Sequence, residues 1–313
     1  MKRVRYKSHA GIVIRDRDKP VHVVEFKTAA QGPGHMRRAA YLATMLESPH
    51  WGTVQGYDNC GLSAGPFHWI GRYPRTGKQG PLFGLLRRVE QSLGDNNDDA
   101  AYEAKDHLGV LWNALRDRGL YVAMDGKLRS YTNGKLITGT AFRDVVAPIK
   151  GKVSVKGADR VYAEEWAMCF HRLLKDEATY SAQVDYAIDY LTRGQGRLEM
   201  KVYRKLTGNP ELVMPDRVAH MSTTMDLAMC VYHAFSVNAP SPAAACLRSM
   251  PLTKAALSDP RAWSRQLIKK LATRKYGNWA KRYTKTRKAA MESNYWFDDR
   301  FKGKDAVMPA KFK

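Results

Sequence analysis

Five glycines punctuate residues 51–71, and this stretch lies between two segments whose apolar residues recur at helical spacing. The glycines are Gly52, Gly56, Gly61, Gly65 and Gly71. The pieces between them are too short for helices, and glycine permits tight turns and a close approach of backbones. The pattern therefore predicts a small β-hairpin held between helices over 36–46 and 81–93. The first helix ends at Ser48-Pro49, because a residue before proline disfavours helical geometry.

The rest of the chain has mostly helical periodicity. Further helices are predicted over residues 100–118, 163–176, 178–193, 197–206, 215–236, 242–248, 260–275 and 277–293. Two regions differ: a β-hairpin over 11–28, formed by Ile12–Ile14 and Val21–Phe26, and a polar excursion over 120–160. The excursion contains two hairpin-turn signals, Asp125-Gly126 and Asn133-Gly134. The predicted fold class is mainly α (α+β), divided into an N-terminal β-hairpin extension (1–35), a main domain (36–293) and a basic tail (294–313).

Composition and charge limit the possible partners. The 313 residues are 44% hydrophobic, which excludes a disordered chain, while 52 Lys+Arg against 30 Asp+Glu leave a net charge of +22. Residues 261–313 hold 16 of these basic residues and only 4 acidic ones, so +12 lies in the last sixth of the chain. An anionic partner is expected: cell-wall polymer, or DNA bound through the basic C-terminal helices.

Several classes of protein are disfavoured by the absence of their signals. Four scattered cysteines give neither a disulfide scaffold nor a zinc motif. The basic N-terminus, residues 1–5, is not followed by an apolar segment, so no ordinary signal peptide is expected. The longest uncharged run, 227–247, contains two prolines and predicts a buried helix and turn instead of a membrane span.

Glu47 is the first candidate for chemistry. It ends the helix over 36–46, and the glycine-rich stretch that follows contains Asp58 and Ser63. Glycosidic cleavage needs a carboxylic acid that stays protonated near neutral pH beside a second polar group or carboxylate. A glutamate near Trp51 and Trp69 is placed for a pKa raised by desolvation. The alternative from spacing alone is a solvated glutamate followed by simple turns.

Residues 46–70 resemble the active-site block of lysozyme-superfamily glycan hydrolases, which include chitosanases and phage or bacterial muramidases. That block has a glutamate at a helix end and then a hairpin of the form Asp-x-x-Gly-(Ile/Leu)-Ser-x-Gly. Weaker similarities, at 80–86, 221–228 and 282–290, extend the resemblance over roughly 36–293. The resemblance implies a lysozyme-like helical core with the hairpin beside an active-site cleft.

The resemblance also implies roles for individual residues. Glu47 would be the general acid, Asp58 the second carboxylate or a hairpin organiser, and Ser63 would bond within the site. His68 stands where the family usually has glutamine, and its imidazole would bond sugar or Glu47. If Asp58 takes no part, a lone glutamate suits a lytic transglycosylase, so hydrolysis and transglycosylation both stay open. Aromatic side chains that would stack on sugar rings, or belong to the core, are Trp51, Tyr57, Trp69 and Tyr73.

The expected function is therefore cleavage of the β-1,4 glycan of peptidoglycan, without a metal or organic cofactor. High charge and the missing signal peptide favour a phage-encoded enzyme, carried in the virion or made in the host cytoplasm and released to the periplasm and cell wall. A second hypothesis is a Mg²⁺-dependent nuclease or basic nucleic-acid-binding protein, based on Glu25-Phe26-Lys27 at the end of a predicted strand. The usual interpretation of such a strand is alternating solvent-facing charges.

Overall fold

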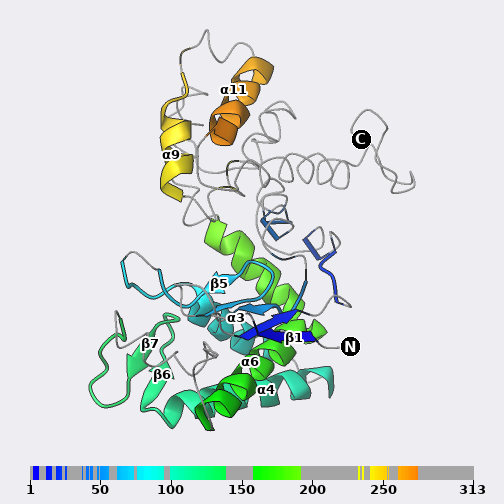
Figure 1. The fold of residues 1–313 in the computed structure, drawn as a ribbon, viewed down its shortest axis with the longest axis vertical. Helices are drawn as coiled ribbons and strands as arrows, with labels where there is room; N and C mark the ends of the chain where they lie inside the picture. Colours follow the sequence, from blue (N-terminus) through cyan, green and yellow to red (C-terminus); the bar gives the residue numbers. More distant parts are fainter. Residues whose placement is uncertain are drawn as a thin grey trace. The chain divides into compact units, whose positions relative to one another are not determined.

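The computed structural model divides the chain into two compact units (Figure 1). One comprises Met1–Val21 and Glu47–Tyr186, and the other His22–Leu46 and Ala187–Lys313. The structure describes residues 3–6, 12–15, 19–22, 25–26, 37, 40–41, 43–44, 48, 50–55, 62–73, 76–94, 99–138, 158–191, 232, 235, 240–251, 253 and 260–273. Within these residues, no helix combines the length and apolar character that crossing a bilayer requires.

A five-stranded antiparallel sheet organises the first unit. Its strands, in spatial and chain order, are β1 (Arg3–Tyr6), β2 (Ile12–Arg15), β3 (Val54–Gln55), β4 (Ser63–Ala64) and β5 (Trp69–Ile70). The three short strands β3 to β5 form the ribbon predicted from the glycine-punctuated stretch, so that prediction is confirmed. We call β3 to β5 with their connecting turn 65–68 the glycine ribbon.

One row of side chains across the sheet is apolar and buried. The register aligns Ile14 with Val54, Val54 with Ala64, and Ala64 with Trp69. Trp69 packs edge-on against Tyr186 of the helix over 180–191, and α6 (Ala158–Lys175) contacts β2, β3 and β4. This row is therefore the side of the sheet that packs on helices. Residues directly opposite in an antiparallel pair share a face, so Gln55 and Ser63 lie together on the other side.

Two helices and a second hairpin complete the first unit. The helices are α3 (Leu82–Gly94) and α4 (Asp99–Arg116), and the hairpin consists of β6 (Leu120–Val122) and β7 (Leu128–Ser130). The predicted apolar face of the first helix is confirmed, since Leu82, Leu85, Leu86, Val89 and Leu93 are all buried. Both predicted turns are confirmed as well: Asp125-Gly126 joins β6 to β7, and Asn133-Gly134 leads into a segment that pairs back on β7 through an Arg129–Leu136 bridge.

The second unit is described mainly by two helices, α9 (Pro240–Arg248) and α11 (Pro260–Thr273), both in predicted positions. They are joined by polar bonds: Lys270 Nζ donates to Ser249 O at 2.9 Å, and Trp263 Nε1 donates to Pro251 O at 2.9 Å. The described residues of the predicted helix over 36–46 are helical, and so are Tyr232 and Phe235. The predicted helices over 197–206 and 277–293 lie outside the described residues.

The predicted strand Val21–Phe26 is wrong. Glu25 and Phe26 are helical, and Phe26 packs edge-on against Tyr41 with ring centroids 5.6 Å apart. β2 takes its partners from β1 and β3 instead, and β1 was not predicted. The strand that suggested a nuclease-type Glu-x-Lys motif is therefore absent at Glu25 and Phe26. The coarse fold class is confirmed: the protein is mainly helical with a small antiparallel sheet.

Candidate functional site

The candidate site begins at a short loop that leads from Ser48 into the glycine ribbon. Ser48 is buried, and its Oγ lies 2.7 Å from Thr53 Oγ1, which in turn donates to His50 O at 3.1 Å. Pro20 forms a β-bridge with His50, and Trp51 N donates to Lys19 O at 3.0 Å. Bonds at both ends thus hold the loop immediately before β3.

A glycine and a buried histidine fix the middle of this loop. Gly52 has a φ of +68°, and its carbonyl oxygen accepts a 2.7 Å hydrogen bond from Nδ1 of His171, a fully buried residue of α6. Because a carbonyl can only accept, this bond places the imidazole proton on Nδ1. A Cβ at position 52 would lie 2.6 Å from His171 O, so the backbones of the loop and helix touch here without room for a side chain.

Three polar side chains gather on the glycine ribbon beyond the loop. Gln55 and Ser63 are paired across β3 and β4, and both are buried. Gln55 Nε2 lies 2.9 Å from His68 Nε2. An amide nitrogen is a donor, so His68 Nε2 accepts and the imidazole is neutral, with its proton on Nδ1. We call Gln55, Ser63 and His68, which lie on the described part of the glycine ribbon, the polar cluster.

His68 has an unusual backbone. Its φ of 47° is the single positive value among non-glycine residues in the described part of the chain. The turn over 65–68 produces it: Gly65, with a φ of +75°, accepts from His68 N at 3.0 Å and donates to Thr53 O at 2.7 Å. A strained residue persists only where its surroundings hold it, and such residues concentrate at functional sites. In this conformation the imidazole lies within hydrogen-bond distance of Gln55.

The two tryptophans predicted near the site are core residues. Trp51 is 1% exposed and stacks on Tyr180, with ring centroids 4.0 Å apart and an interplanar angle of 11°. Trp69 is 3% exposed and lies between Phe67 and Tyr186. Both rings therefore lie in the hydrophobic core, which is one of the two alternatives that the sequence left open. Tyr73, by contrast, is 37% exposed.

The remaining predicted site residues, Glu47, Asp58 and Tyr57, lie outside the described residues. The sequence analysis missed Gln55, which bonds His68 across thirteen positions of the chain. Its signal was available in principle, since a polar residue opposite Ser63 in a two-strand hairpin must share its face. The bond from His171 to Gly52 has no local signal, because 119 positions separate the two residues.

The side chains of the polar cluster are suited to forming hydrogen bonds and not to carrying charge. The polar cluster contains an amide, a hydroxyl and an imidazole; Gln55 and Ser63 are buried, and His68 is the half-buried member. Such groups form hydrogen bonds without adding charge. Across the residues that the structure describes, no group of three or more His, Cys, Asp or Glu side chains could hold a metal ion. No protein-family model, curated protein or solved structure matches this chain.

Proposed function

We propose that this protein cleaves the β-1,4 glycan of peptidoglycan, as a muramidase or a lytic transglycosylase, with Glu47 as the general acid. The observation that carries the proposal is the polar cluster of Gln55, Ser63 and His68 on the glycine ribbon. Its first member, Gln55, lies on β3. Ser48, the residue that follows Glu47 in the sequence, is bonded through its hydroxyl to Thr53, immediately before β3.

In the proposed reaction, Glu47 donates a proton to the glycosidic oxygen of a bound sugar. General acid catalysis requires the proton donor to lie within hydrogen-bond reach of the glycosidic oxygen, and neutral groups that hold the sugar fix that distance. A neutral His68 adds no positive charge to the polar cluster. Extra positive charge would lower the pKa of the acid and favour its unproductive, ionised form. The polar cluster therefore supports a site that keeps a glutamic acid protonated.

The proposal includes where the enzyme comes from and how it reaches its substrate. The net charge of +22 favours an anionic substrate layer such as the cell wall, and we propose a phage-encoded enzyme that reaches it from the virion or host cytoplasm. Neither a metal nor an organic cofactor has a part in this mechanism. Whether Asp58 activates water, or the substrate's own hydroxyl attacks, decides between hydrolysis and transglycosylation.

Glu47→Gln should reduce cleavage of isolated sacculi by at least about a hundredfold, because the amide cannot donate the proton that the leaving oxygen needs. Mass analysis of the released fragments also identifies the reaction: reducing ends indicate hydrolysis, and 1,6-anhydro ends indicate transglycosylation. Glu103→Gln is the matched control, since that glutamate is on α4 with 77% of its side chain exposed. Equal cleavage by wild-type protein and Glu47→Gln would refute the assignment, as would DNA retention with no effect on the wall.

A further inference from the structure

The β6–β7 hairpin presents a solvent-facing side that the fold does not use. Leu120, Val122 and Leu128 are buried and alternate along the strands with Tyr121 and Arg129, which are paired directly. Tyr131 follows on the same side: its ring centroid is 4.8 Å from that of Tyr121, with an interplanar angle of 39°. Leu136 joins them through its bridge to Arg129. We call Tyr121, Arg129, Tyr131 and Leu136 the hairpin face.

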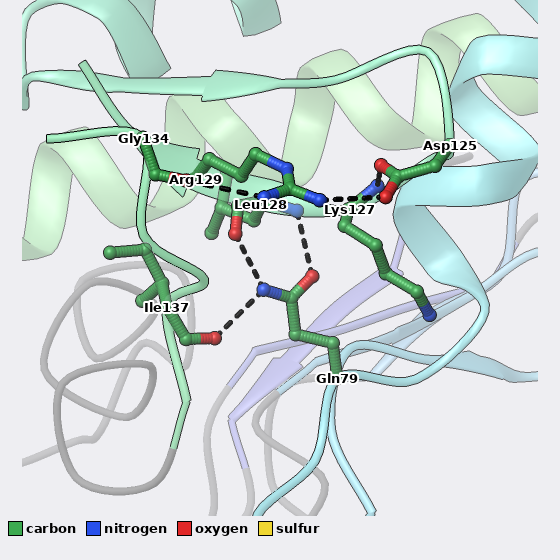
Figure 2. A network of polar contacts seen from close by, with 7 residues as sticks. All are labelled: Gln79, Asp125, Lys127, Leu128, Arg129, Gly134 and Ile137. Atoms are coloured by element: carbon green, nitrogen blue, oxygen red, sulfur yellow. Dashed lines mark hydrogen bonds and ion pairs between the residues drawn. The ribbon is translucent and has the colours of Figure 1, made fainter.

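The hairpin face combines aromatic and aliphatic side chains with one arginine, and part of it is accessible. Tyr131 is 57% exposed and Leu136 is 48% exposed. Tyrosine pairs supply large, amphipathic contact area at a low cost in conformational entropy, and they are enriched in binding surfaces. Arg129 does not move freely between them, because its guanidinium donates to Asp125 at 2.8 Å and to Gly134 O at 3.2 Å (Figure 2).

The charge around this face is positive. Asp125 is the one acidic residue of segment 119–138, and Arg129 lowers the pKa of its carboxyl, chiefly through their hydrogen bond, so it stays ionised and paired. Lys127 and Lys135 flank the face, and neither forms a salt bridge with another described residue. In Figure 2 the Lys127 ammonium group points away from Asp125. Two cations thus remain for an external anion.

The hairpin is also fixed to the glycine ribbon. Gln79, which forms a bridge with Arg72 just after β5, bonds Leu128 and Ile137 through its side-chain amide (Figure 2). Gly126 packs directly on Gly84 of α3, where an added Cβ would lie 2.6 Å from Gly84 Cα. A long polymer bound at one of these two places would therefore meet the other in a constant geometry.

We propose that the hairpin face is a second binding surface for peptidoglycan, with the tyrosines stacking on sugar rings of the glycan strand and Lys127 and Lys135 meeting the carboxylates of its stem peptides. This inference rests on the proposed function for its choice of polymer. Neutral sugar faces match the tilted tyrosine pair, and the carboxylates of stem peptides match the two lysines. A surface away from the cleaved bond would hold the enzyme on an insoluble substrate between cleavages.

The test measures binding without cleavage. Full-length Glu47→Gln protein is mixed with isolated sacculi, and the bound fraction is titrated with and without Tyr121→Ser plus Tyr131→Ser. We expect about tenfold weaker binding, in line with the loss of aromatic anchors. Tyr102→Ser on α4, which removes a tyrosine that is 62% exposed, should bind as the parent does. If the double variant fails to fold, Lys127→Gln plus Lys135→Gln replaces it, with binding expected to weaken severalfold at low salt.

Unchanged retention on sacculi in the correctly folded hairpin variants would overturn the inference. A second result would also overturn it: the hairpin variants bind a single-stranded DNA oligonucleotide more weakly but bind sacculi as before. The surface would then bind nucleic acid. Neither result depends on cleavage. Failure of the proposed function would instead be seen as glycan cleavage that survives Glu47→Gln, or as no cleavage by the wild-type protein.

Discussion

Gly52→Ala should lower the free energy of unfolding by about 2–5 kcal/mol. A residue with a Cβ resists the φ of +68° at this position, which costs about 1–2 kcal/mol. The new methyl group would also lie 2.6 Å from His171 O and 2.8 Å from Lys175 Cβ, and forcing α6 away from the loop costs about 1–3 kcal/mol more. Urea unfolding followed by circular dichroism measures the change.

Gly119→Ala is a control matched in backbone conformation. Gly119 has the same φ of +68°, but no atom lies within 4 Å of the Cβ that alanine would add. Its substitution should therefore show the conformational cost alone, about 1–2 kcal/mol. The difference between the two variants isolates the contact between the loop and α6. Equal destabilisation by both would show that the helix yields freely, and that the bond from His171 to Gly52 does not fix the loop.

This contact matters for the candidate site because the loop lies between Ser48 and the glycine ribbon. Displacement of Gly52 would disturb the hydrogen bond between Ser48 and Thr53 and the start of β3, where Gln55 begins the polar cluster. Gly52→Ala should consequently reduce the proposed glycan cleavage beyond what its loss of stability explains. Activity measured well below the unfolding transition, where both proteins are folded, separates the two effects.

Local sequence signals predicted the elements whose cause is local. The leucine and valine spacing of α3 identifies its buried face, because one side of a helix is set by residues three and four apart. The turns at Asp125-Gly126 and Asn133-Gly134 were predicted because both sequences favour positive φ, and Gly126 and Gly134 have φ values of +71° and +67°. These features need no knowledge of distant residues.

Features that depend on distant partners were missed or predicted wrongly. Val21–Phe26 has strand propensity, but propensity is weak against tertiary context, and Phe26 is helical and packs on Tyr41. β2 pairs with β1 and β3, a choice that no local pattern specifies. At the candidate site, Ser63 and His68 were predicted, whereas Gln55 depended on the exact strand register. Glu47 and Asp58 stay predictions from the sequence.

Gln79→Leu should destabilise the protein by about 3–5 kcal/mol. The buried Gln79 side chain forms hydrogen bonds with the backbone of the hairpin, as a neighbouring strand would. Its Oε1 accepts from Leu128 N at 2.7 Å, and its Nε2 donates to Leu128 O at 2.6 Å and to Ile137 O at 2.8 Å (Figure 2). Leucine has similar volume but no polar atoms, so Leu128 N–H and Ile137 O lose the bond to the amide, while Leu128 O keeps the bond from Ile137 N. Each buried group left unsatisfied costs about 1–3 kcal/mol.

The control is Gln91→Leu, the same change at an exposed position of α3, which should alter stability by less than about 0.5 kcal/mol. Hydrogen exchange locates the effect, because the amide of Leu128 bonds directly to the lost side chain and should lose its protection first. If Gln79→Leu unfolds at the same urea concentration as the wild-type protein, the amide is not the attachment of the hairpin. The packing of Gly126 on Gly84 of α3 would then be the contact that fixes the hairpin.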